Sequence, residues 1–342
     1  MGSSVPAEEP NLAKEYFCAG VGKFLDGEYE EAKIEFREAL KFDATLPLAY
    51  CYLGIISLEL GEVEEGVSWC EQGLEIDPEN GYLHYCLGAA LERKGQFEEA
   101  IDQYQIYLKE HPRDAECLFS LGCVHDQTEA FEEAISYYRQ ALTFDPNHYK
   151  ASYNLALVLA EQGMDEGAIE SLHKTVDIHP TYWKGWVKLG LFYSNKKQWR
   201  EAADAYIQAI ELRPELSDSY YNLGLCYLTG NQADKAVKAF EGARIRDPED
   251  VESIFYEAIS YVDLKQEEKA IEILYQALTI DLEHEKSHYL LGRLYCMQGE
   301  MEKGRKELAY LEARGSDFVS TLKPCFETKP KRKKASASKP DY

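Results

Sequence analysis

The sequence predicts an all-α fold, a solenoid of nine stacked pairs of antiparallel helices. Three observations predict it. Small residues recur every 34 positions, each 34-residue row has two stretches with the period of an amphipathic helix, and turn or breaker residues follow these stretches. Because one helix pair cannot bury both of its faces alone, such rows are expected to stack on one another.

Two columns of small residues define the rows when the chain is written in lines of 34 from Ala13. The first column holds Gly20, Gly54, Gly88, Gly122, Ala156, Gly190, Gly224, Ala258 and Gly292. The second holds Ala32, Gly66, Ala100, Ala134, Ala168, Ala202, Ala236, Ala270 and Gly304. Four places after the second column stands a large apolar residue in most rows, with Cys70 as the weak member. Only Gly or Ala leaves room where two helices cross closely, and we expect the large side chain of the facing helix to fill the adjacent space.

Each row is expected to contain two helices separated by a turn. In row seven, apolar residues recur at three- and four-residue steps over residues 220–227 and again over residues 236–243. Gly230-Asn231 lies between these stretches and predicts the turn. Pro248 follows the second stretch and prevents that helix from continuing.

The columns resemble those of the tetratricopeptide repeat family. The positions that carry the resemblance in row six are Trp186, Leu189, Gly190, Tyr193, Ala202, Tyr206 and Pro214. The resemblance covers residues 13–318 and implies a right-handed superhelical solenoid of antiparallel helix pairs. Three departures stand out: Ala44 and Leu282 replace the terminal proline of rows one and eight, and Glu257 stands where the family usually has leucine.

The two ends lie outside the repeat frame. We expect residues 1–12 to be disordered and residues 319–342 to form a short cap followed by a disordered basic tail. Phe318 and Leu322 lie four residues apart, so a short helix over residues 317–322 is expected to cover the open end of the last row until Pro324 stops it.

Composition and cysteine spacing favour a folded cytoplasmic protein. The chain has 342 residues, 45% of them hydrophobic, and a net charge of −24. No apolar run approaches the roughly 20 residues that cross a bilayer, and the first ten residues lack the basic and apolar regions of a signal peptide. Nine cysteines occur without a C-x-x-C pair, which argues against a disulfide framework. Most thiols should be buried, and Cys325 is the one expected to be exposed.

The segment HEKSH, residues 284–288, matches the H-E-x-x-H motif of zinc hydrolases. In the repeat frame His284 ends row eight and Glu285 opens the first helix of row nine. A zinc site needs both imidazoles on one established helical face with a third ligand nearby, and no third histidine follows in the metzincin spacing. A zinc hydrolase is therefore a disfavoured alternative, and no catalytic, metal or cofactor site is expected. Glutamate pairs such as Glu98-Glu99 are expected on the solvated first turn of the second helices, where they complement the helix dipole.

The resemblance implies a protein or peptide ligand on the concave face, held by places two, five, six, nine and twelve of each row. These places lie on the first helices. No small-molecule substrate is expected, and the oligomeric state is left open. Aromatic rings and amides at these places suit an extended peptide. The candidate residues are Tyr82, Tyr85, Phe119, Lys150, Tyr153, Asn154, Lys184, Lys188, Tyr221 and Asn222.

Asn154, Lys184 and Lys188 are similar to half of the carboxylate clamp by which some relatives hold the acidic C-terminus of a chaperone. The other half is absent, because Phe119 and Cys123 occupy its places. The lysines favour an acidic or C-terminal peptide segment, since they concentrate positive charge in an acidic protein. A co-chaperone or secretion-type chaperone is the more specific alternative, and ordinary solvated lysines are the plain one.

Residues 329–334 form a basic run in the tail. From Lys323 onward the net charge is +5, which leaves −29 for residues 1–322. Such a run can direct nuclear import, contact nucleic acid or membrane phosphate, fold back on the acidic solenoid, or act as a solubilising end. Nucleic acid is not an expected partner of the solenoid itself, because its charge repels phosphate.

Overall fold

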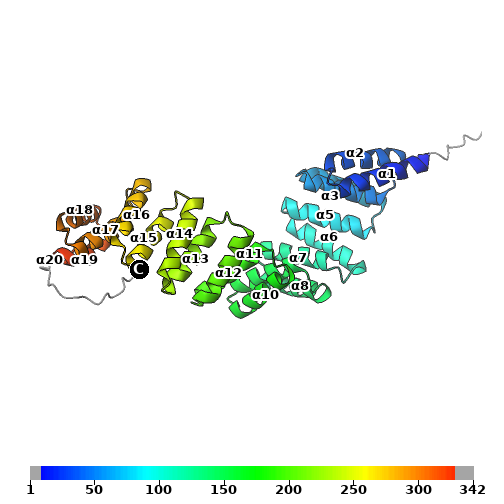
Figure 1. Cartoon of the computed structure of the whole chain (residues 1–342). Helices are drawn as coiled ribbons and strands as arrows, with labels where there is room; N and C mark the ends of the chain where they lie inside the picture. Colours follow the sequence, from blue (N-terminus) through cyan, green and yellow to red (C-terminus); the bar gives the residue numbers. More distant parts are fainter. Residues whose placement is uncertain (1–8, 328–342) are drawn as a thin grey trace, which may run out of the picture. The chain divides into compact units, whose positions relative to one another are not determined.

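The computed structural model describes residues 9–327, with side chains from residue 12 onward. This range contains twenty helices and no strand, which confirms the predicted all-α fold (Figure 1). Disorder was predicted for residues 1–12, but α1 begins at Glu9, so residues 9–12 are helical. The rest of the predicted disorder at the two ends falls on residues 1–8 and 328–342, which lie outside the described range.

The helices follow the repeat frame. The first helices of the pairs are α1 (Glu9–Leu25), α3 (Pro47–Glu59), α5 (Gly81–Lys94), α7 (Ala115–Gln127), α9 (Tyr149–Glu161), α11 (Trp183–Asn195), α13 (Ser217–Thr229), α15 (Val251–Asp263) and α17 (Glu285–Gln298). The second helices are α2 (Tyr29–Phe42), α4 (Val63–Ile76), α6 (Phe97–Glu110), α8 (Phe131–Phe144), α10 (Asp165–Ile178), α12 (Trp199–Leu212), α14 (Ala233–Arg246), α16 (Glu267–Ile280) and α18 (Met301–Arg314). From row two onward each first helix begins at place one of its row, and every second helix begins at place seventeen.

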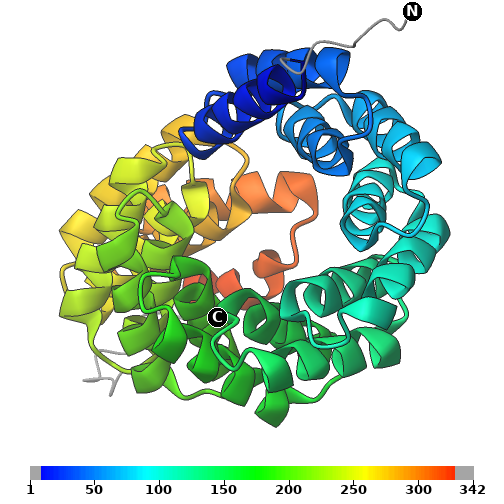
Figure 2. The ribbon, with the colours of Figure 1, turned by 90° about the vertical axis from the view of Figure 1, so that its right-hand side faces the viewer.

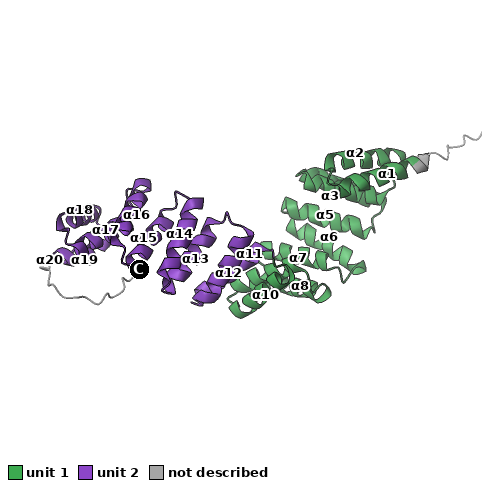
Figure 3. Cartoon of the chain, viewed as in Figure 1, with its two compact units in different colours: residues 1–180 green, residues 181–342 purple. Residues whose placement is uncertain are grey.

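The chain divides into two compact units, residues 1–180 and residues 181–342 (Figure 3). Unit 1 contains α1 to α10, and unit 2 contains the remaining helices. Within each unit, every helix packs on the next one along the chain, as the ribbon views show (Figure 2).

The first helices form the inner layer of unit 1. Helix α5 contacts both α3 and α7, and α7 also contacts α9. Among the described residues, no two consecutive second helices approach each other as closely. The stack therefore curves toward its first helices, and we call the exposed side of α3, α5, α7 and α9 the inner face of unit 1.

The two small columns permit this packing. A Cβ atom added at Gly88 would lie 2.8 Å from the ring of Tyr104, and one added at Gly122 would lie 2.5 Å from the ring of Tyr138. Both rings are fully buried. The predicted pairing of a small residue with a facing large one is therefore confirmed, and each tyrosine reaches across its helix pair beneath the first helix.

A left-handed residue at place fifteen turns the chain from the first helix to the second. Five rows have glycine there, and four rows have Glu129, Lys197, Asn231 or Lys265 with φ between 56° and 59°. In row seven the residue in this conformation is Asn231, whereas Gly230 has an ordinary φ of −77°. The turn lies where it was predicted, but the left-handed residue in it is Asn231 and not Gly230.

Proline is not required to end the second helices. Helix α2 ends at Phe42 although Ala44 stands in the proline column. The side chain of Asp43 accepts a hydrogen bond from the backbone N–H of Thr45 at 2.9 Å, and this bond forms the turn. Asp281 does the same in row eight, where Leu282 replaces the proline.

A short C-terminal helix covers the last helix pair. Helix α19 (Phe318–Leu322) buries Leu322 completely, and a Cβ atom added at Gly292 would lie 2.7 Å from its side chain. Helix α19 ends before Pro324, and Pro324 begins a further short helix, α20 (Pro324–Glu327). The fixed φ of proline suits the first turn of a helix.

The predicted exposure of Cys325 was also wrong. Its side chain is half-buried against α17, and its carbonyl oxygen accepts a hydrogen bond from the thiol of Cys296 at 3.0 Å. Among the described cysteines the exposed one is Cys18. The other described thiols are buried or half-buried, as predicted.

Candidate functional site

The ten candidate ligand-binding residues lie on first helices, but they belong to two units. Six lie on α5, α7 and α9 of unit 1, and four lie on α11 and α13 of unit 2. Asn154 is in unit 1, whereas Lys184 and Lys188 are in unit 2. Their joint action on one carboxylate therefore stays a prediction.

The aromatic candidates of unit 1 differ in accessibility. Tyr82 is 53% exposed and its ring centroid lies 5.5 Å from that of His111. Phe119 is half-buried, 4.7 Å from the ring of His148. Tyr85 is also half-buried, and burial raises the pKa of its hydroxyl. Tyr153 is only 9% exposed, so it offers a ligand much less surface than the other three.

A polar group that the sequence analysis did not identify lies at the start of α7 and α9. His148 Nδ1 accepts a hydrogen bond from the backbone N–H of Ala151, so Nε2 carries the hydrogen. Nε2–H donates a hydrogen bond to the carboxylate of Glu116 at 3.0 Å. This bond lowers the pKa of Glu116, and the nearby charge of the exposed Lys150 lowers it further. The group combines one stabilised carboxylate with one exposed lysine beside Phe119.

The floor of the inner face between α5, α7 and α9 is also polar. The hydroxyl of Tyr104 donates to Glu92 at 2.7 Å, and the amide of Asn154 donates to the thiol of Cys123 at 3.5 Å. The hydroxyl of Tyr138 is buried and has no hydrogen-bond partner among the described residues. Asp126 stands at the same place of its row as Glu92. Both carboxylates stand at place twelve, one of the places that the resemblance implies for ligand binding. This shared place is the sequence signal that could have identified them.

In unit 2 the candidate residues form a smaller group. Tyr221 packs edge-on against Phe240 at 5.9 Å between ring centroids, and burial raises the pKa of its hydroxyl. Asn222 and Lys188 are half-buried. Lys184 is exposed, with its ammonium group 5.8 Å from the ring centroid of Trp183.

A separate cleft of about 510 Å³ in unit 2 involves none of the ten candidate residues. It lies at the turns of rows six and seven, where Trp199, Asp204, Tyr227 and Lys235 line it. Its lining carries charges of both signs, so it has no clear electrostatic preference.

The residues of the HEKSH segment serve the packing of row nine. His284 is the residue before α17, and its Nδ1 contacts the hydroxyl of Ser287 at 2.8 Å. His288 uses both ring nitrogens: Nδ1 bonds to Glu307 at 2.6 Å and Nε2 donates to the carbonyl oxygen of Leu282 at 3.0 Å. Within residues 12–327, no three histidine, cysteine or acidic side chains are grouped so that they could hold a metal ion.

His84 shows that this use of histidine belongs to the repeat. It stands at the same place in row three, with Nε2 at 3.0 Å from the carbonyl oxygen of Pro78 and Nδ1 at 2.7 Å from Gln103. In row two, Tyr50 donates to the carbonyl oxygen of Ala44, again six residues earlier. In these three rows the residue at this place ties the first helix to the turn that precedes it.

Sequence profiles described as tetratricopeptide repeat match residues 48–80, 85–149, 127–185, 188–251 and 258–284, which together make up more than half of the chain. The chain belongs to the tetratricopeptide repeat family. Members of this family bind peptide or protein partners, and the chain is accordingly a protein-interaction scaffold.

Solved structures of other tetratricopeptide repeat proteins share the fold. A C-terminal part of a repeat-containing protein from Cytophaga hutchinsonii is 18% identical, with a TM-score of 0.58 over 70% of this chain and 98% of that one. PilF of Pseudomonas aeruginosa is 19% identical, with a TM-score of 0.54 over 60% and 94%. YrrB, described as having an unusual peptide-binding site, is 21% identical, with a TM-score of 0.50 over 54% and 95%.

No curated protein matches this tetratricopeptide repeat protein at a significant level. Within the part of the chain that the structure describes, every helix is too short or too polar to traverse a lipid bilayer.

Proposed function

We propose that this tetratricopeptide repeat protein is a non-enzymatic scaffold that binds peptide segments along the inner face of its first helices. The supporting observation is a difference in exposure between the structural columns and the columns expected to bind a ligand. The small columns and their facing large residues are buried, whereas Tyr82, Phe119 and Asn154 at the ligand-binding places keep part of their surface exposed. Aromatic rings and amides that remain accessible on a rigid layer can hold an extended peptide at low entropic cost.

A zinc hydrolase gains no support from the HEKSH segment. A zinc-bound histidine needs a free ring nitrogen, and both nitrogens of His288 are already bonded to Glu307 and Leu282. Metal analysis of the purified protein tests this point. We expect no stoichiometric zinc, and one zinc per chain would contradict the non-enzymatic assignment.

An acidic or C-terminal peptide segment is the ligand that the lysines of α11 favour. Neither Lys184 nor Lys188 forms an ion pair within residues 12–327, so both charges are available to an anionic group. The alternative is a co-chaperone or secretion-type chaperone with a partial carboxylate clamp. Its weakness is that Phe119 and Cys123 stand where that clamp has Lys and Asn.

Affinity capture with a matched pair of double variants tests this function. Lys184→Glu with Lys188→Glu changes the charge of the first helix α11. Lys238→Glu with Lys306→Glu makes the same change on exposed positions of the second helices α14 and α18. We expect partners to be lost in the first variant and kept in the second. Equal loss in both would contradict a role for the inner face, and recovery of a chaperone would favour the co-chaperone alternative.

We further propose a cytoplasmic location, with nuclear import through residues 329–334 as the alternative. A reporter fused to residues 323–342 tests the alternative by its distribution. If the tail binds nucleic acid, truncation after Glu327, which keeps α20, removes that activity. The same truncation leaves peptide binding by the first helices unchanged.

A further inference from the structure

The C-terminal segment of residues 318–326, which we call the strap, packs on row nine. Its two short helices α19 and α20 both contact α17, and α19 also contacts α18 (Figure 1). Phe318 stacks on Tyr289 of α17, with 4.9 Å between the ring centroids. Leu322 is completely buried beside Gly292, which is also on α17. The strap therefore lies on the first helix of row nine along much of its length.

A glycine in row nine makes room for the far end of the strap. Most rows have alanine in the second small column, whereas row nine has Gly304. A Cβ atom added at Gly304 would lie 2.6 Å from the ring of Phe326, so an alanine there would collide with that ring. The ring also packs against the buried cluster of row nine that includes Leu308 and Leu311. Helix α20 thus has a defined seat on the last helix pair.

Each side of this contact carries a cysteine. Cys296 is in the last turn of α17, and Cys325 is the second residue of α20. The thiol of Cys296 donates a hydrogen bond to the backbone carbonyl oxygen of Cys325 at 3.0 Å. Because that oxygen is two bonds from the Cα atom of Cys325, the Cys296 sulfur lies within about 5.5 Å of this Cα atom. A disulfide can span this separation, since its two Cα atoms lie up to roughly 7 Å apart.

Both cysteines are half-buried, so they keep part of their surface accessible to a small reagent. Most of the other described cysteines, such as Cys51 and Cys86, are buried. Burial raises the pKa of the Cys296 thiol, and the charge of Cys325 and a hydrogen bond to it raise this pKa further. Cys296 therefore keeps its proton at neutral pH, and the first reaction with an oxidant falls to Cys325.

We propose that Cys296 and Cys325 are a thiol modification site whose disulfide locks the strap onto row nine. The oxidant is a small disulfide such as glutathione disulfide. The thiolate of Cys325 attacks one sulfur of this reagent, which releases one glutathione thiolate and leaves a mixed disulfide on Cys325. Cys296 then loses its proton to solvent, and its sulfur attacks the Cys325 sulfur and releases the second glutathione. Two protein thiols are thereby oxidised to one disulfide, while one glutathione disulfide is reduced to two thiols.

The lock acts on the stability of the end of the chain, so it goes beyond the proposed peptide binding and does not depend on it. Short helices at a chain end open more easily than the core of a domain. The disulfide would close the loop of residues 296–325 and restrict the strap in its open state. A half-exposed disulfide is readily reduced, so the lock is reversible. While it is closed, the strap also covers Tyr289 and Cys296, which stand at places five and twelve of row nine.

Titration of the full chain with glutathione buffers of rising disulfide content tests the site. Alkylation, proteolysis and mass spectrometry then identify the linked cysteines. We expect a crosslink between Cys296 and Cys325 that forms in native buffer and is removed by dithiothreitol. Cys325→Ser should abolish the crosslink, whereas Cys18→Ser, which removes the exposed thiol of α1, should keep it. Glutathione attached to Cys325 without this crosslink, or a crosslink that forms only in guanidinium chloride, would overturn the proposal.

Hydrogen–deuterium exchange of the same samples tests the lock itself. Backbone amides of the strap should exchange about tenfold more slowly in the oxidised natural chain than in the reduced one, because the open strap loses freedom. Cys296→Ser is the matched variant, since its hydroxyl can still donate to the Cys325 carbonyl but forms no disulfide. Its strap should exchange like that of the reduced natural chain under both conditions. Equal exchange in the oxidised and reduced natural chain would overturn the lock even where the crosslink forms.

Discussion

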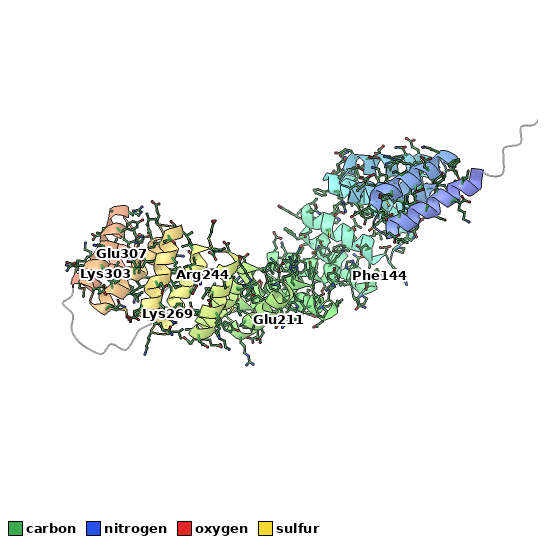
Figure 4. The ribbon with its side chains drawn as sticks, turned by 45° about the horizontal axis from the view of Figure 1, so that its top comes forward. Phe144, Glu211, Arg244, Lys269, Lys303 and Glu307 are labelled. Carbon is green, nitrogen blue, oxygen red and sulfur yellow. The ribbon has the colours of Figure 1, made fainter. Side chains whose placement is uncertain are left out.

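At the scale of single residues, the same repeat position holds a histidine with a neutral partner in row three and a charged partner in row nine. His84 bonds to the neutral amide of Gln103, whereas His288 bonds to the carboxylate of Glu307. Glu307 lies on α18 and is labelled in Figure 4. Burial alone would lower the pKa of His288, but its bonds to Glu307 and to the Leu282 carbonyl outweigh burial and the opposing charge of Arg314, so its pKa is raised. The ring of Tyr310 stacks on this histidine at 3.8 Å.

The raised pKa of His288 predicts a pH-dependent stability for row nine. Its contribution is fully present below the pKa of an unfolded histidine, about 6.5, and is lost as pH rises through the higher folded value. Thermal melts between pH 6 and pH 9 measure this, and Glu307→Gln makes row nine resemble row three. We expect Tm to fall with pH more steeply in the natural chain than in Glu307→Gln. Identical pH profiles would show that the pair contributes no such dependence.

Glu257 predicts a second residue-level effect. This carboxylate is only 2% exposed and accepts a hydrogen bond from Arg244 at 2.9 Å, although burial still raises its pKa. Removing one partner of a buried ion pair usually costs about 3 kcal/mol, whereas an apolar replacement of the buried group can be neutral. In urea unfolding, Arg244→Ala should therefore destabilise unit 2 more than Glu257→Leu, which restores the usual residue of the family. The reverse order would contradict this account.

The sequence predicted residue roles where sterics decide them. The glycine and tyrosine columns were predictable because a close helix crossing admits few residue types. The partners of Glu257 and the unpartnered hydroxyl of Tyr138 were not, since side-chain orientation and neighbouring rows decide them. Cys325 was expected to be exposed for a similar reason: its burial depends on a helix that begins at Pro324.

At the scale of helices and turns, the rows tolerate strain at place fifteen. A residue with a Cβ atom pays about 1 kcal/mol for the left-handed conformation, and Glu129 adopts it with φ of 59°. Glu129→Gly should raise the free energy of unfolding by about 0.5 kcal/mol, because part of the relief is lost to the greater freedom of the unfolded chain. Gly95→Ala, at the same place of row three, should lower it by about 1 kcal/mol. Denaturant unfolding measures both, and equal signs would contradict the assignment.

Helix boundaries were predictable because several signals agree. The period of 34 places every second helix. A proline or aspartate follows most of these helices, whereas Gly315 follows α18. Asp43 shows why the proline column alone was an incomplete guide: an aspartate side chain forms the same turn without proline. The helix that begins at Pro324 was not predicted, because proline can begin a helix as well as prevent one from continuing.

At the scale of the whole molecule, the division after Pro180 had no sequence signal. Rows five and six follow each other in the 34-residue frame without an insertion. The frame predicts which residues pack within a row, but not where one compact unit ends. The candidate site shows the same limit. The columns expected to face a ligand stay a prediction, and the sequence did not indicate that Tyr153, in one of them, would be largely buried.

Hydrogen–deuterium exchange of the full chain, measured with and without a peptide selected from a random peptide library, tests the central claim most directly. If the first helices bind the peptide, their backbone amides should exchange more slowly in its presence. The second helices should change little. Protection confined to the second helices, or no protection at a saturating peptide concentration, would contradict the claim.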